Sequence, residues 1–150
     1  MRVFHGLEEF AAAKGEHLGH SDWHTVTQEQ IDTFAAATGD HQWIHVDPAK
    51  AASGPFGTTI AHGYLTLSLI PMLGWQIFTV EGISMGVNYG TEKVRFPAVV
   101  PVGSRVRAGL ELVDVTDVAG GKQAVLRYTV EVEGNPKPAC VADAVVRLIA

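Results

Sequence analysis

The spacing of apolar residues changes about half-way along the chain. In the first half, residues such as Ile31, Phe34 and Ala35 recur at the spacing of a helix. From Ile83 onward, apolar and polar residues alternate in several stretches, which is typical of half-buried strands. The sequence therefore predicts an α+β chain in which the helices come first and long strands follow.

The first helix carries both a start and a stop signal. Thr27 and Gln30 have the spacing of a capping box, and Gly39 fits the end of a helix. We therefore expect a helix that delivers Asp40 at its end. A short strand over residues 22–26 is expected to precede it.

A second, shorter helix is predicted directly downstream. Asp47 followed by Pro48 is typical of a cap and a first helical position, so a helix is expected over residues 48–52. Residues 53–59 contain two glycines and a proline and are expected to form a loop. The stretch before Asp47, residues 40–46, is expected to be a loop as well.

The longest helix candidate runs from Ala61 to Gln76. Its apolar residues surround the helix axis instead of keeping to one face, which predicts that the helix is buried. Pro71 lies inside it and should kink the helix or mark a break between two segments.

Four long strands are expected after this helix. The turn signal Gly120-Gly121 predicts a hairpin between two of them. The candidate strands cover residues 87–96 with a bend at Gly90, 105–112, 124–133 and 139–149. Four long strands and one buried helix predict an antiparallel β-sheet wrapped around a central helix, which is the hot-dog fold.

Composition narrows the class of protein. The 150 residues, of which 47% are hydrophobic and 18% charged, suit a single globular domain over residues 1–150. The net charge of -5 argues against nucleic-acid binding. We expect neither a signal peptide nor membrane insertion, because the longest apolar run, over residues 65–73, is short and interrupted. Cys140 is the only cysteine, which fits a cytoplasmic protein without an intrachain disulfide.

Candidate chemistry lies in the first half, because all seven histidines fall within residues 1–62. Asp40 and His45 are five residues apart, and a carboxylate beside an imidazole can share proton transfers. Gly63 starts the long helix, where a free backbone N–H can hold a developing oxyanion. Simpler roles stay open: a helix-end carboxylate, a buried core histidine, and a glycine required by a close helix–sheet contact.

These residues form a longer motif. The motif is Thr38-Gly39-Asp40-His41-Gln42-Trp43-Ile44-His45-Val46-Asp47, followed by Ile60-Ala61-His62-Gly63. It resembles the MaoC-like, or hydratase 2, family of hot-dog (R)-specific enoyl-CoA hydratases. The usual family pattern has Asn-Pro where this chain has Gln42-Trp43, and that variant resembles the nodulation-protein-N-like branch.

The resemblance implies roles for individual residues. Asp40 and His45 would hold and activate one water that adds to a trans-2-enoyl thioester, with acid and base not assigned between them. The N–H of Gly63 would hold the thioester oxygen. Four positions are expected to bind substrate or support the pair: Gln42, His62, Ser68 and Asn88. Ser68 is otherwise an ordinary helix-packing residue, and Asn88 a bulge or edge residue of a strand.

No cofactor or metal is expected, and coenzyme A or an acyl carrier protein would carry the acyl thioester substrate. His41 and His45 are four residues apart, but a loop would not place them on one face, and a third ligand at zinc-like spacing is not obvious. A cluster of cations could contact phosphates of the carrier or simply form solvated strand faces. The cluster consists of Lys93, Arg95, Arg105 and Arg107.

Two other functions remain open from the sequence. One is a thioesterase on the same fold, and the other is a non-catalytic module that binds acyl thioesters. A homodimer is expected, because a single curled sheet leaves an open edge. The strands over residues 105–112 and 124–133 are the expected contacts.

Overall fold

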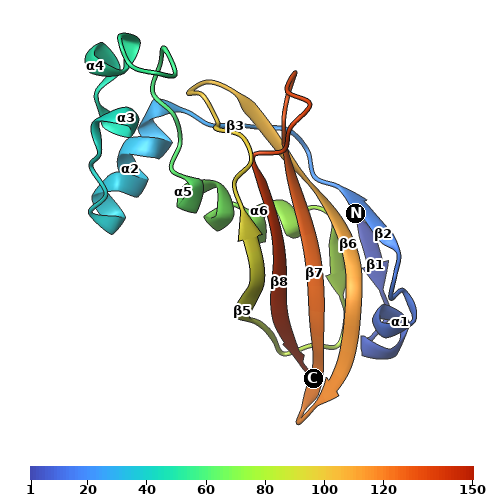
Figure 1. Cartoon of the computed structure of the whole chain (residues 1–150). Helices are drawn as coiled ribbons and strands as arrows, with labels where there is room; N and C mark the ends of the chain where they lie inside the picture. The colour runs from blue at the N-terminus through green and yellow to red at the C-terminus, as the bar shows by residue number, and fades with distance from the viewer.

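The computed structural model describes all residues, 1–150. Its centre is an antiparallel sheet in the order β2-β6-β7-β8-β5, with β3 also paired to β6 (Figure 1). The strands are β2 (His17–His20), β3 (His24–Thr25), β5 (Met85–Arg95), β6 (Arg105–Val118), β7 (Gly121–Val132) and β8 (Cys140–Ile149). A separate parallel pair consists of β1 (Arg2–Phe4) and β4 (Phe78–Val80). The predicted α+β architecture is confirmed.

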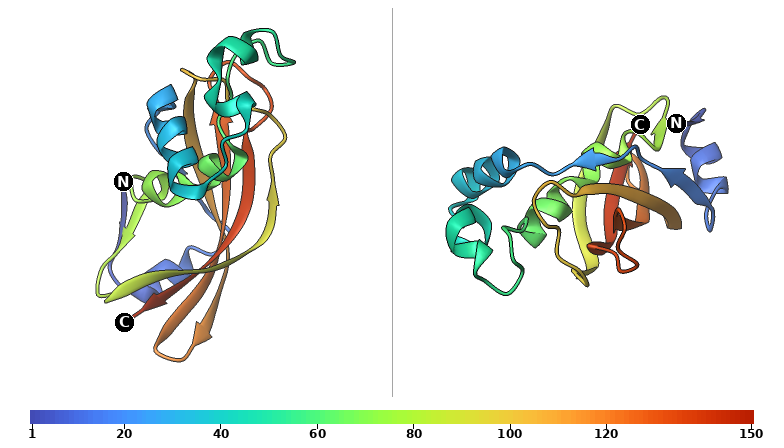
Figure 2. Two further views of the ribbon diagram at one scale, coloured as in Figure 1. Left: turned by 90° about the vertical axis from the view of Figure 1, so that its left-hand side faces the viewer. Right: turned by 90° about the horizontal axis from the view of Figure 1, so that it is seen from above.

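The helices fall into three groups. They are α1 (Leu7–Ala12), α2 (Gln28–Thr38), α3 (Trp43–Val46), α4 (Pro48–Ala52), α5 (Gly63–Ser68) and α6 (Ile70–Gly74). Helices α5 and α6 lie along one face of the curved sheet. Helix α1 lies beside β1 and β2, at the lower right in Figure 1 (Figures 1 and 2). Helices α2 to α4 form a lobe that projects to one side of the sheet, level with one end of the long strands (Figures 1 and 2). No helix is long and apolar enough to cross a membrane.

The core lies between the sheet and helices α5 and α6. Alternate residues of β6 are fully buried, as the period of two predicts, among them Leu110 and Leu112. They belong to one apolar cluster that also includes Leu65 and Leu73 from the two helices. Each fully buried leucine side chain contributes about 1.5–3 kcal/mol to folding.

The helix predicted over residues 61–76 is two helices. Pro71 lies in the first turn of α6, where its missing N–H costs nothing, so the break that proline predicts is confirmed. The prediction of burial on all sides is wrong. Tyr64 and Trp75 are 71% and 74% exposed, because the sheet covers only one side of these helices.

Local signals at the helix ends are confirmed. The Thr27 side chain accepts a hydrogen bond from the N–H of Gln30, and Gly39 ends α2 with a φ of 84°. Asp47 caps α4 by accepting from the N–H of Lys50 at 3.0 Å. The expected loop over residues 40–46 is partly wrong, because residues 43–46 form the single turn of α3.

Both ends of the projecting lobe are fixed to one segment of the sheet. Val26, just before the lobe, exchanges two main-chain hydrogen bonds with Gly103 and Ser104. Just after the lobe, Thr59 accepts from the N–H of Val102, and Ala61 donates to Val100. The lobe that carries Asp40 and His45 is therefore anchored at residues 100–104.

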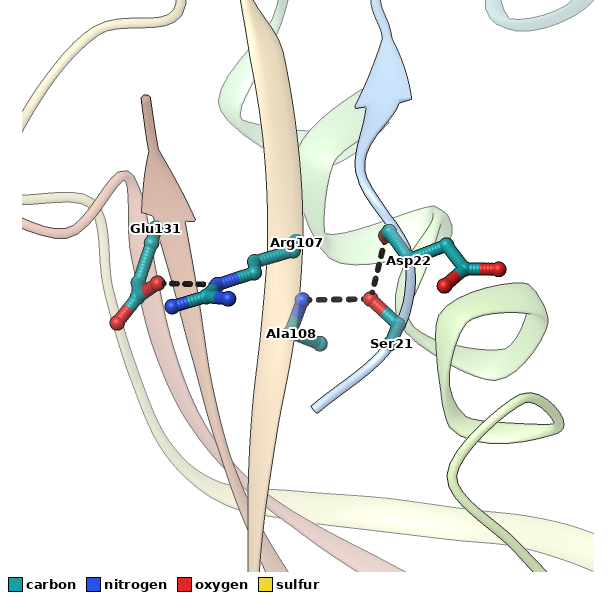
Figure 3. Close-up of polar contacts among 5 residues, drawn as sticks. All are labelled: Ser21, Asp22, Arg107, Ala108 and Glu131. Atoms are coloured by element: carbon teal, nitrogen blue, oxygen red, sulfur yellow. Dashed lines mark hydrogen bonds and ion pairs between the residues drawn. The ribbon is translucent and has the colours of Figure 1, made fainter. Parts of the chain in front are cut away.

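A serine fixes the path of the chain into this lobe. Between β2 and β3, the Ser21 hydroxyl accepts from the N–H of Ala108 at 3.0 Å and donates to the carbonyl of Asp22 at 2.9 Å (Figure 3). The N–H of Ser21 donates in turn to the carbonyl of Ala108. These bonds hold residues 21 and 22 against β6 shortly before α2 begins.

The sheet has two edge strands, of which β5 is much longer than β2. Strand β5 pairs only with β8, and its register shifts twice, near Gly90 and near Lys93. The bend expected at Gly90 thus corresponds to an irregularity in the strand. The strands predicted to make dimer contacts, over residues 105–112 and 124–133, lie largely in β6 and β7 inside the sheet, and this contact stays a prediction.

Candidate active site

Asp40 and His45 of the lobe come together with His62, the residue just before α5. One polar side-chain atom of each lies within 4.8 Å of those of the other two. Gly39 turns the chain out of α2 to place Asp40, α3 carries His45, and His62 precedes α5. The helix stop and a single helical turn therefore place Asp40 and His45, which are close in sequence, and the start of α5 brings His62, 22 residues after Asp40, to them.

His45 is a buried base with one free nitrogen. It is 6% exposed, and its Nδ1 lies 2.7 Å from the carbonyl oxygen of Ile60. A carbonyl only accepts, so Nδ1 carries the proton and Nε2 keeps its lone pair. Burial lowers the pKa of His45, and the nearby His62 adds to this lowering against the opposing effects of Ile60 and Asp40. The imidazole is therefore suited to accept a proton at Nε2.

His62 holds its two neighbours. It is 2% exposed, and its Nε2 donates to the main-chain carbonyl of Asp40 at 2.9 Å. Its ring stacks on that of His45, with centroids 3.8 Å apart and planes inclined by 23°. Its Nδ1 is buried without a hydrogen-bond partner, which typically costs about 1–3 kcal/mol. His62, one of the residues expected to support the pair, therefore contacts both the main chain of Asp40 and the ring of His45.

Asp40 is the exposed member of the pair. One of its carboxylate oxygens accepts from the N–H of Gln42 at 3.3 Å. The other oxygen has no partner within the protein and can accept from a water. An exposed carboxylate beside a buried neutral imidazole can hold one water between two acceptors.

Gly63 satisfies both explanations that the sequence left open. It is the first residue of α5, and no side chain caps this helix end. Its N–H therefore lacks an intrahelical partner. A Cβ at this position would lie 3.0–3.1 Å from three ring carbons of Phe96, so any other residue would need this ring to shift. Gly63 and His45 both line a small cavity of about 110 Å³ together with Thr66 and Phe96.

Three predicted supporting residues lie away from the pair within this chain. The Ser68 side chain lies on the exposed side of α5, and its hydroxyl donates to the carbonyl of Tyr64 at 2.7 Å. The Gln42 side chain is exposed, and only its main-chain N–H contacts Asp40. Asn88 lies on the edge strand and lines a second cavity of about 410 Å³ beneath α6, next to Tyr128.

The cluster also contains the third potential metal ligand that the sequence did not indicate. The ligand pair considered from sequence involved His41, which is exposed and lies outside the cluster. The in-plane lone pairs of His45 and His62 run in stacked planes only 23° apart, so they do not converge as tetrahedral coordination requires. This geometry fits a water better than a metal ion.

The expected cluster of cations separates into two kinds. Arg105 pairs with Glu133 and Arg107 with Glu131, and both guanidinium groups lie over the ring of Trp23 (Figure 3 shows Arg107 with Glu131). These arginines are neutralised by carboxylates on the neighbouring strand. Of these four cations, only Lys93 and Arg95 of β5 lack an ion pair. The expected contact with carrier phosphates therefore narrows to these two residues.

Comparison with known proteins agrees with this geometry. Residues 9–134 match the family described as the MaoC like domain. The chain belongs to the MaoC-like family. It is 60% identical over 151 residues to 3-hydroxyacyl-thioester dehydratase Z of Mycobacterium tuberculosis, covering all of both chains. It is 46% identical over 141 residues to nodulation protein N of Rhizobium leguminosarum, covering 91% of this chain and 87% of the relative.

A solved structure supports the same assignment. The (R)-hydratase from A. caviae superposes with a TM-score of 0.74 at 28% identity, covering 89% of this chain and 96% of the other. The predicted hot-dog fold and MaoC-like membership are thereby confirmed. With its dehydratase and hydratase relatives, this MaoC-like chain is an enzyme of the hydro-lyase class.

Proposed function

We propose that this chain catalyses the reversible addition of water to a trans-2-enoyl thioester, giving a (3R)-3-hydroxyacyl thioester. The carrier is coenzyme A or an acyl carrier protein. The observation that carries the proposal is the buried, neutral His45 with a free Nε2 beside the Asp40 carboxylate. The names of the relatives, a 3-hydroxyacyl-thioester dehydratase and an (R)-hydratase, support the same reaction.

The geometry supports a mechanism with one water and one base. Asp40 and the Nε2 of His45 hold the water as two hydrogen-bond acceptors. The water oxygen bonds to C3, and its proton passes to Nε2 while the double-bond electrons move toward the thioester oxygen. The N–H of Gly63 stabilises the resulting oxyanion. His45 then returns the proton to C2, so that hydrogen and hydroxyl add on one face; dehydration follows the reverse course.

We further propose that the enzyme works as a homodimer joined along β5. This strand has a free edge, and the apolar side chains of Met85, Val87 and Tyr89 are 54%, 42% and 59% exposed on it. An open edge with exposed apolar residues favours pairing with another copy. Sedimentation at micromolar concentration should find a dimer. Val87→Lys should weaken it, whereas Phe56→Lys in the loop after α4 should not.

The reaction itself is tested with crotonyl-CoA. Loss of the enoyl absorbance together with formation of the (3R)-hydroxy product is the expected result. Release of free thiol would indicate the thioesterase instead. Saturable binding of the substrate without turnover would indicate a non-catalytic acyl-binding module.

A further inference from the structure

We infer that Gln28 is a positioning residue for His45 and acts on it by two routes, an inference that rests on the function proposed above. Gln28 is the first residue of α2 and is half-buried. Its side chain is not needed to cap the helix, because Thr27 already accepts the N–H of Gln30. The Gln28 side chain instead reaches His45 in α3 and Thr59, shortly before α5.

The Gln28 amide is fully engaged. Its Nε2 donates to the main-chain carbonyl of His45 at 2.7 Å and to a carboxylate oxygen of Asp32 at 2.9 Å. Its Oε1 accepts from the hydroxyl of Thr59. Reversing the amide would set its oxygen against a carbonyl and a carboxylate, so the three partners fix its orientation.

The first route runs through the main chain of His45. Helix α3 consists of four residues and has no side-chain cap at its start. A single turn has little stability of its own, and the last carbonyls of a helix lack intrahelical donors. Gln28 supplies the donor for the His45 carbonyl and thereby ties this turn to the start of α2.

The second route runs through Thr59 to the imidazole. Thr59 is 1% exposed, and its hydroxyl donates to Gln28. The next residue, Ile60, accepts the Nδ1–H of His45 and donates its own N–H to Ile44 at 3.0 Å. Gln28, Thr59, Ile60 and His45 thus form a closed ring of contacts. This ring fixes both the position of His45 and the tautomer that leaves Nε2 free.

Gln28→Met tests both routes together, because methionine keeps the length of the side chain and loses all three hydrogen bonds. We expect kcat to fall about tenfold or more with KM within about twofold, since small displacements of a catalytic group are costly. Gln30→Met is the matched control. Gln30 lies on the same helix and is also half-buried, but its side chain bonds to His24 at 2.9 Å and not to the site.

A pair of variants at Thr59 tests the second route and remains informative if Gln28→Met does not fold. Thr59→Val removes the hydroxyl with little change of shape and should lower kcat in the same way. Thr59→Ser keeps the hydroxyl and should recover most of the activity. The double variant Gln28→Met/Thr59→Val should lose less than the product of the two single losses, because both act through one network.

Nitrogen-15 NMR of the histidine side chains gives a readout independent of turnover. In the wild type, His45 should show a protonated Nδ1 and an unprotonated Nε2, and folded Gln28→Met should lose this fixed tautomer. Unchanged His45 resonances with kcat within twofold of wild type, or an equal loss in Gln30→Met, would overturn the inference. If the wild type hydrates no enoyl thioester, the proposed function fails, and the NMR comparison still decides whether Gln28 positions His45.

Discussion

The imidazole rings of His45 and His62 lie face to face, with centroids 3.8 Å apart. Each ring donates one hydrogen bond to a main-chain carbonyl, His45 to Ile60 and His62 to Asp40. The two rings therefore brace each other, while their bonds determine which nitrogen of each remains free. Through His62, the stack links the main chain of Asp40 to the imidazole of His45.

His62→Phe should separate the two contributions of this residue. Phenylalanine preserves an aromatic ring against His45 but cannot donate to the Asp40 carbonyl. We expect a folded enzyme whose kcat is lower by about tenfold or more, because Asp40 is no longer held in place. Steady-state kinetics together with circular dichroism measure this. A folded variant with wild-type kcat would show that the bond to Asp40 is dispensable.

Asp40→Asn and His45→Gln should each lower kcat far more than they change KM. General acid–base groups typically supply about 10²–10⁴-fold in rate, and in the proposed mechanism both residues act on the transition state. If both hold one water, the double variant should be far less impaired than the product of the two losses. His41→Ala serves as a control, because His41 is exposed and lies outside the cluster of Asp40, His45 and His62.

The pH dependence should report the neutral form of His45. Burial lowers the pKa of this group below its ordinary value of 6.5, so the unprotonated base persists in more acidic solution than a free histidine would allow. Activity should be complete above this pKa and fall as the pH drops through it. The profile of kcat/KM should therefore have its acidic limb below pH 6.5. A limb above that value would contradict the assignment of His45 as the base.

Gly63→Val should crowd both Phe96 and the thioester. The expected loss is on the order of 10²–10³-fold in kcat, similar to the loss of an oxyanion donor. Adding Phe96→Ala removes the aromatic contact while leaving any crowding of the thioester. If activity then returned to that of Phe96→Ala alone, the glycine would be required only by its packing against the ring.

Gly74→Ala should destabilise the protein through Tyr128. A Cβ on Gly74 would lie 2.6 Å from the buried Tyr128 hydroxyl, and overpacking of this kind costs about 1–3 kcal/mol. Tyr128→Phe removes the oxygen and should relieve most of the cost in the double variant. Urea denaturation measures both effects.

Features that depend on neighbouring residues could be predicted from the sequence. The ends of α2 and α4 follow from Thr27, Gly39 and Asp47, because a cap is a bond between residues a few positions apart. Strands β6, β7 and β8 follow from alternation, because each has one face on the core, whereas β5 is exposed along nearly its whole length. Helix α3 could not be predicted, since four residues are too few to display a helical period.

Features that depend on tertiary contacts could not be predicted. The bond from His62 to Asp40 spans 22 residues and ends on a carbonyl, which every residue possesses. The bonds from Gln28 to His45 and Thr59 could not be predicted for the same reason. The exposure of Trp75 was missed because apolarity alone does not tell a core contact from a surface that another molecule could cover.

The attachment of the lobe at residues 100–104 has a consequence for how activity can be lost. Its two ends meet at one place, so loss of the main-chain bonds there, together with withdrawal of Ile31 from the core, would free α2 to α4 and leave the pairing of β6, β7 and β8 intact. Proteins commonly open in such contiguous units at free energies below that of global unfolding. Mild heat or denaturant would then dismantle Asp40 and His45 as a pair while circular dichroism still recorded a folded sheet.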